Sequence, residues 1–142
     1  MTNNLKKELL LAQWQTCVEM ADSVSKQRTT INSIFITLNL GIIAMTAKIQ
    51  KLYLSFLLIT VGIILCCLWT MLINHYRQLN QIKFEIINEI EKQLPEQPFT
   101  KEHKIQKNRK NYKNSTKLEK YLPYIIILLY VIYIILIIFF KT

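Results

Sequence analysis

Glycine, proline and acidic residues are all scarce in this sequence. Its 142 residues include two Gly, three Pro and nine Asp or Glu, set against 18 Lys or Arg. Because Gly and Pro mark most tight turns, their scarcity argues against a fold of many short strands and predicts long helices. The excess of basic residues gives a formal net charge of +9, although 51% of the residues are hydrophobic. Charged and apolar residues are therefore expected to occupy separate stretches.

Side chains that commonly carry out catalysis or bind metals are also few. The histidines, His75 and His103, lie far apart in sequence, and neither belongs to a recognisable nucleophile–base arrangement. The cysteines, Cys17, Cys66 and Cys67, do not have the spacing of a four-ligand zinc site. Both glycines lie in apolar stretches, which excludes a glycine-rich phosphate loop. We expect no enzymatic activity, no metal site and no cofactor.

Three stretches without any charged residue, 30–47, 52–74 and 121–140, dominate the apolar part of the sequence. About 20 helical residues, rising ~1.5 Å each, cover a hydrocarbon core of ~30 Å. The sequence therefore predicts an all-α membrane protein with three transmembrane helices, embedded in a lipid bilayer. Pro123 is expected in the tolerated first turn of the third helix. No cleavable signal peptide is expected, because the first apolar stretch follows a long tail of mixed charge.

The polar segments between these stretches also favour helices. Residues 1–29 are predicted to form an amphipathic N-terminal helix that lies at the membrane interface, packs on other cytoplasmic helices or continues the first span. Residues 75–94 are predicted to form a second cytoplasmic helix, which ends at Pro95. Residues 95–120 form a basic linker, with eight Lys or Arg between residues 101 and 120.

The distribution of these basic residues predicts the orientation of the chain. The segment between the second and third spans carries eleven Lys or Arg, whereas the first loop carries two and the end of the chain one. Because basic loops remain on the cytoplasmic side, this segment and the N-terminus are expected in the cytoplasm. The C-terminus is then expected on the periplasmic or extracellular side.

Polar residues recur every seven positions in the first two spans. Asn32, Asn39 and Thr46 share one helix face, and Thr60, Cys67 and Asn74 share another, together with Tyr53. Because hydrocarbon cannot satisfy an amide, these side chains are expected to face protein or water. One interpretation is contact between helices or subunits. The other is that the face of the first span lines an aqueous path through an oligomer.

The cytoplasmic segments offer a second set of candidates. A predicted cytoplasmic interface comprises Trp14, Arg77, Leu79, Asn80, Lys83, Phe84, Ile86 and Glu91. The basic linker is interpreted as a solvated orientation signal or as a contact for anionic lipid headgroups. Nucleic-acid binding is not expected, because the linker has one aromatic residue, Tyr112, and lacks a folded reader module.

Short stretches around the spans together carry a family resemblance. The first set is Val18-Glu19-Met20-Ala21-Asp22, Ser25, Arg28, Asn32, Phe35 and Leu38-Asn39. The second is Trp69, Tyr76-Arg77, Leu79-Asn80, Lys83-Phe84, Ile87, Glu89, Glu91, Leu94-Pro95, Pro98-Phe99, Glu119, Tyr121 and Pro123-Tyr124. In this order and spacing, roughly residues 14–135 resemble the RipA-like family of small bacterial inner-membrane proteins, which are described as octameric. The resemblance implies a bacterial cytoplasmic membrane location and self-assembly into an octamer, without an enzymatic activity or a ligand.

Three functional hypotheses follow from the sequence. The first is a non-enzymatic membrane protein that forms a homo-oligomer with a cytoplasmic helical collar. The second is a regulated ion channel or pore used in stress or phage defence, with Asn39 along the path. The third is a membrane scaffold that docks a cytoplasmic partner on residues 75–94.

Overall fold

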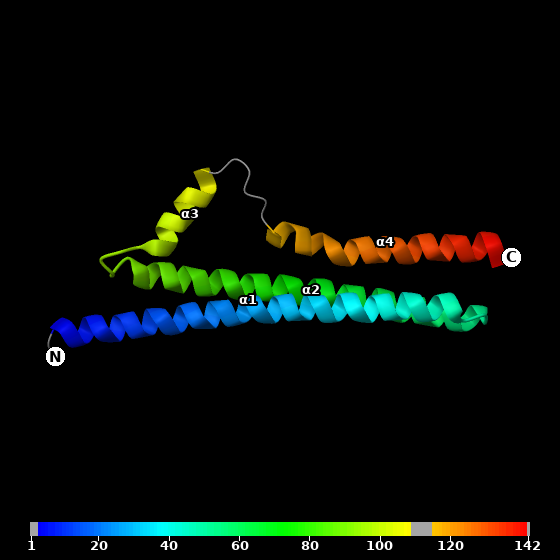
Figure 1. Ribbon diagram of the computed structural model, residues 1–142, viewed down its shortest axis with the longest axis horizontal. Coiled ribbons are helices and arrows are strands. Elements are labelled where there is room, and N and C mark those ends of the chain that lie inside the picture. Colours follow the sequence, from blue (N-terminus) through cyan, green and yellow to red (C-terminus); the bar gives the residue numbers. More distant parts are fainter. Residues whose placement is uncertain (1–2, 109–114, 142) are drawn as a thin grey trace. The chain divides into compact units, whose positions relative to one another are not determined.

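The computed structural model describes residues 3–108 and 115–141, and these are almost entirely helical (Figure 1). The helices are α1 (Asn3–Lys48), α2 (Leu52–Glu91), α3 (Pro98–Asn108) and α4 (Ser115–Lys141). Within these ranges there is no β-strand. Three of the helices, α1, α2 and α4, are long and apolar enough to cross a membrane. The structure confirms the predicted all-α class with three spans.

The helix boundaries differ in detail from the predicted segments. The predicted amphipathic helix and the first span form one uninterrupted helix, α1, and α2 likewise joins the second span to the predicted cytoplasmic helix. No proline lies within either helix, so neither helix loses a backbone donor along its length. The predicted basic linker contains α3 and the first turns of α4. Its central residues, 109–114, lie outside the described part, and the headgroup contact predicted for the linker stays a prediction.

Pro123 is not in the first turn of α4, and that prediction was wrong. The helix begins at Ser115, so Pro123 lies well inside it, and its side chain is fully buried. The charged residues before the apolar stretch were expected to belong to the linker. They extend the helix instead, since residues 115–122 contain no glycine or proline that would end it.

The chain forms two compact units, which are described separately. The span unit contains residues 28–75 and 115–141, and the tail unit contains residues 3–27 and 76–108 of the described chain. Because α1 and α2 are each continuous across the boundary, both helices contribute to both units.

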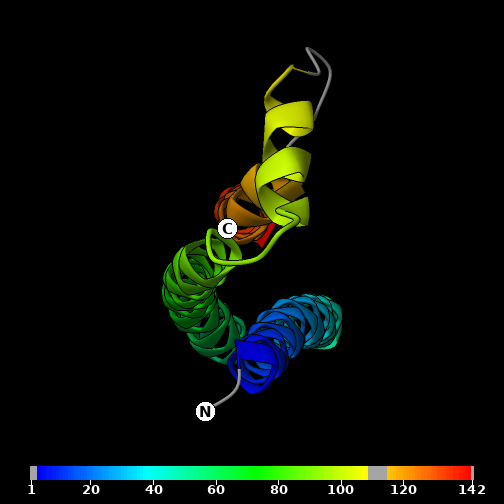
Figure 2. The ribbon, with the colours of Figure 1, turned by 90° about the vertical axis from the view of Figure 1, so that its left-hand side faces the viewer.

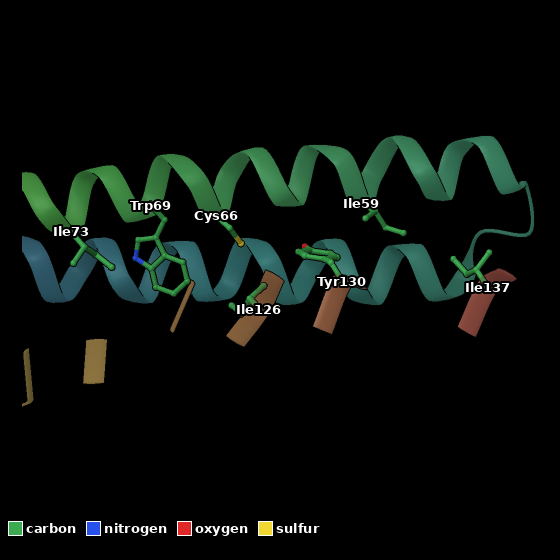
Figure 3. Close-up of a cluster of buried hydrophobic side chains, with 7 residues drawn as sticks. All are labelled: Ile59, Cys66, Trp69, Ile73, Ile126, Tyr130 and Ile137. Carbon is green, nitrogen blue, oxygen red and sulfur yellow. The ribbon is translucent and has the colours of Figure 1, made fainter. Parts of the chain in front are cut away.

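The core of the span unit lies between its helices. Its fully packed side chains are Ile59, Cys66, Trp69 and Ile73 of α2 and Ile126, Tyr130 and Ile137 of α4 (Figure 3). The α2 residues recur at spacings of seven, three and four, which places them on one helix face. From α1, Phe35 stacks on Trp69 with ring centroids 5.7 Å apart and planes inclined by 6°. All three spans therefore meet in one core.

The tail unit is smaller and more polar. Ala21 and Val24 of α1 and Ile87 and Glu91 of α2 are buried there. In this unit α3 turns away from the axis of α2 (Figures 1 and 2). An aromatic side chain of α3, Phe99, joins it to the longer helices. Its ring lies 5.8 Å from that of Trp14 and 5.8 Å from that of Phe84.

Candidate functional site

The polar face of α1 points into the span unit. Asn32, Asn39 and Thr46, which the seven-residue spacing placed on one face, are all buried. Two of them also bond within their own helix. The Asn39 amide nitrogen donates to the Phe35 carbonyl at 2.8 Å, and the Thr46 hydroxyl donates to the Ile42 carbonyl. These bonds satisfy donors that hydrocarbon would leave without a partner.

Asn39 joins the three spans through its side-chain oxygen. This oxygen accepts a hydrogen bond from the Tyr130 hydroxyl of α4 at 3.1 Å and one from the Cys66 thiol of α2 at 3.4 Å. All three residues are almost completely buried. Polar contacts of this kind hold transmembrane helices at a defined register, because a shifted helix would leave the buried amide unpaired.

A second polar contact between α1 and α2 lies seven residues before Asn39, at Asn32. The Trp69 ring nitrogen donates to the side-chain oxygen of Asn32 at 2.9 Å. Both side chains are buried, and the stack of Phe35 on Trp69 fixes the indole plane. Asn32 and Asn39 therefore use their oxygens to bind α2 to α1 at two levels.

The corresponding set on α2 lies on a different face. Thr60 and Cys67 are exposed in the single chain, Asn74 is half-buried, and Tyr53 is largely exposed. The Thr60 hydroxyl is satisfied within the helix, because it donates to the Phe56 carbonyl at 2.9 Å. The predicted polar residues of α1 are therefore buried in the core, whereas those of α2 mostly face away from it.

An ion pair that the sequence did not predict ties α1 to α4 at the edge of the span unit. Arg28 Nε lies 3.1 Å from Glu119 Oε2, and the two side chains are only 15% and 23% exposed. Both residues stand just before an apolar stretch, and this shared position is the signal that could have suggested the pair. Tyr130 was also missed as a site residue, since nothing in its isoleucine-rich surroundings marks it as a partner of Asn39.

Glu91 organises the tail unit. Its side chain is fully buried, although it is charged. One carboxylate oxygen accepts from the Phe99 backbone N–H at 2.8 Å, and the other accepts from the Thr100 N–H at 3.0 Å and the Thr100 hydroxyl at 2.8 Å. A carboxylate from α2 therefore caps the N-terminus of α3, where free N–H groups and the helix dipole favour negative charge.

The remaining predicted interface residues surround this cap. Trp14 and Phe84 both pack against Phe99. Arg77, Leu79, Asn80 and Lys83 are half-buried, and Ile86 is exposed. Two buried polar atoms in this unit lack a hydrogen-bond partner, the ring nitrogen of Trp14 and the side-chain oxygen of Asn80.

An open groove of about 860 Å³ lies between α2 and α3. Phe84 and Phe99 provide its apolar surface, and Asn80, Gln81 and Asn88 add amide side chains to its lining. Charged side chains of both signs surround these residues: Glu85, Lys92, Glu102 and Lys104. This combination of apolar, polar and charged groups fits a protein segment better than a small apolar ligand.

One protein-family model matches most of the chain. The family is described as the octameric membrane protein family (8xMP), and the match covers residues 11–140. No curated protein matches the chain, and no solved structure matches it. The match confirms the membrane and octameric parts of the resemblance seen in the sequence, while the RipA-like name stays a prediction.

Proposed function

Because the chain belongs to the octameric membrane protein family, we propose that it is a non-enzymatic subunit of a homo-octamer. In this proposal α1, α2 and α4 cross the bacterial cytoplasmic membrane, and the tail units of neighbouring copies form a collar in the cytoplasm. The assembly takes its stability from helix contacts in the membrane and from contacts between tail units.

The observation that carries the proposal is the surface of the tail unit. This unit is rich in Lys and Glu, yet several of its large apolar side chains are about half exposed in the single chain: Leu5, Leu9, Met20, Ile82, Ile86 and Ile105. Burial of the exposed half of each such side chain contributes ~1 kcal/mol, because full burial from water contributes ~1.5–3 kcal/mol. An apolar surface on a charged unit indicates a protein interface, and identical copies of the chain can cover it.

The outer face of α1 in the span unit also supports self-association. The exposed residues on this face are small: Thr30, Ser33, Thr37, Gly41 and Ala44. Ser33 and Thr37 donate to carbonyls within α1, so they do not require water. Small residues allow the backbones of two transmembrane helices to approach closely. Lipid would favour larger apolar side chains at these positions.

The burial of Asn39 bears on the pore hypothesis. Its side chain has no exposed surface in the single chain and is bonded to Cys66 and Tyr130. This arrangement supports the helix-packing interpretation of the polar face of α1 in preference to a water-lined path. The proposed function is therefore assembly, without ion conduction through this face.

The mass of the purified protein in lipid nanodiscs tests the proposal. We expect a native mass spectrum or a light-scattering mass that corresponds to eight copies of the 16.9 kDa chain. A matched pair of variants sharpens the test. Gly41→Ile fills the small outer face and is expected to reduce the number of subunits, whereas Leu40→Ile changes an exposed neighbour and is expected to keep eight. A wild-type protein that is monomeric at every concentration would refute the proposal.

Labelling of intact cells tests the proposed orientation. In a variant whose native cysteines are replaced by alanine, Lys48→Cys is expected to react with a membrane-impermeant maleimide, because the first loop faces outwards. Lys104→Cys is expected to react only after the cells are opened, because basic segments stay in the cytoplasm. Reaction of Lys104→Cys in intact cells would reverse the orientation.

A further inference from the structure

The tail unit of each chain presents a ridge that nothing in the same chain covers. Leu5, Leu9, Ala12, Thr16 and Met20 follow one another along α1 at spacings of three and four residues, so they share one face. All five are exposed, whereas Trp14 and Ala21 on the opposite face are half-buried and buried. We refer to these five residues as the α1 ridge.

The same tail unit presents a second surface, the groove between α2 and α3. Its volume of about 860 Å³ is of the size that accommodates several side chains. Its apolar surface comes from Phe84 and Phe99, which matches the apolar character of the ridge.

We propose that the α1 ridge of one copy lies in the α2–α3 groove of the next copy around the octamer. This inference rests on the proposed function and identifies the contact that would build the collar. The ridge is exposed in its own chain and so does not fill its own groove. A closed ring of identical subunits needs two different surfaces on each subunit, one of which binds the other on its neighbour. The ridge and the groove form such a pair.

The chemistry of the two surfaces agrees with this pairing. A helix that places apolar side chains at i, i+4 and i+7 into an apolar groove is a recurrent mode of protein recognition. Gln13, which is exposed beside the ridge, carries an amide that can bond with the exposed amide of Asn88 in the groove. Lys6 and Glu8 flank the ridge, and Glu85 and Lys92 flank the groove, so both signs of charge are available on each side for complementary pairing.

Disulfide cross-linking in native membranes tests the contact. With Cys17, Cys66 and Cys67 replaced by alanine, Leu9→Cys is combined with Asn88→Cys, which lines the groove. Oxidation is expected to link neighbouring copies into a ladder of bands that reaches eight chains. Leu11→Cys with Asn88→Cys is the matched control, because Leu11 is as exposed as Leu9 but lies on another face of α1. The control is expected to remain mostly monomeric.

The masses of the unoxidised proteins distinguish failure of the ridge–groove contact from failure of the proposed octamer. An octameric mass without the Leu9–Asn88 ladder would overturn the ridge–groove contact and leave the proposed function intact. A monomeric mass for the wild-type protein would overturn both. Equal ladders from the Leu9 and Leu11 pairs would also overturn the contact, since they would show that cross-linking does not depend on the face of α1.

A charge placed in the ridge provides an independent measurement. Leu9→Asp is expected to reduce the octamer to smaller species, and Leu11→Asp is expected to leave it at least mostly octameric. Both positions are about half exposed in the single chain, so neither change removes a core side chain. Quenching of a fluorophore at position 9 by spin-labelled lipid, without loss of the octamer, would place the ridge on the membrane surface and overturn the proposal.

Discussion

Substitution of Gly62 by alanine is expected to destabilise the span unit, whereas the same substitution at Gly41 is not. A Cβ atom at Gly62 would collide with the phenol ring of Tyr130, which occupies the space next to the α2 backbone. Tyr130 cannot simply withdraw, because it is buried and its hydroxyl is bonded to Asn39. Overpacking of a filled core costs ~1–3 kcal/mol, and loss of the buried hydrogen bond adds ~1 kcal/mol.

Unfolding in mixed micelles of mild detergent and dodecyl sulfate measures this effect. The Gly62→Ala midpoint should shift to lower dodecyl sulfate, and the tryptophan emission should report the loss of packing around Trp69. Gly41→Ala is the matched control, since a Cβ there meets nothing within 4 Å. Equal midpoints for the two variants would contradict the packing of α4 against Gly62.

Replacement of Glu91 by alanine is expected to release α3 from α2. The carboxylate accepts three hydrogen bonds from Phe99 and Thr100 while it is itself completely buried. Loss of a buried acceptor leaves its donors unsatisfied at a cost of ~1–3 kcal/mol, and loss of a helix N-cap costs ~1 kcal/mol. An 11-residue helix has little stability of its own, so α3 should then fray.

Hydrogen exchange of the α3 amides checks this expectation. The Phe99 and Thr100 amides should exchange at least tenfold faster in Glu91→Ala, while the amides of the spans stay protected. Glu91→Gln should show a smaller effect, because its single carbonyl oxygen can still accept one of the bonds. Unchanged exchange at Phe99 would rule out the cap.

Glu96→Ala serves as the control for a nearby carboxylate. Glu96 pairs with Lys101, and the hydrogen bond and charge of that lysine lower the pKa of Glu96. Both side chains are exposed, however, and exposed pairs contribute little to stability. Exchange of the α3 amides is therefore expected to be nearly the same as in the unmodified chain.

The three spans could be predicted from the sequence because their signal is local. An uncharged stretch of about 20 residues has few stable environments apart from a bilayer. The continuity of α1 was one of three arrangements that the sequence allowed, and no residue near position 29 decides among them. The helix α3 was missed, because its stabilising cap comes from Glu91 on another helix and not from a residue just before Pro98.

Periodicity showed which residues share a face but not where that face points. The sets on α1 and α2 are equally regular, yet Asn39 is buried and Thr60 is exposed. The partners of Asn39 and Arg28 could not be predicted either. Tyr130 and Glu119 are each 91 residues further along the chain, and only the packing of α4 brings them near. The direction of a helix face is a property of tertiary packing, which a single helix does not encode.

The contacts of Asn39 have a consequence for the synthesis of the protein. The ribosome delivers α1 and α2 before α4, so the newly inserted hairpin has the Cys66 thiol as a donor to this amide oxygen but still lacks the Tyr130 hydroxyl. Until α4 enters the bilayer, the space beside Gly62 that Tyr130 fills in the finished subunit is empty. The side-chain oxygen of Asn39 then has only the weak thiol donor inside the hydrocarbon. The chain in which α1 and α2 are inserted but α4 is not should therefore be the form that membrane proteases and insertion chaperones recognise. Insertion of α4 should end this recognition.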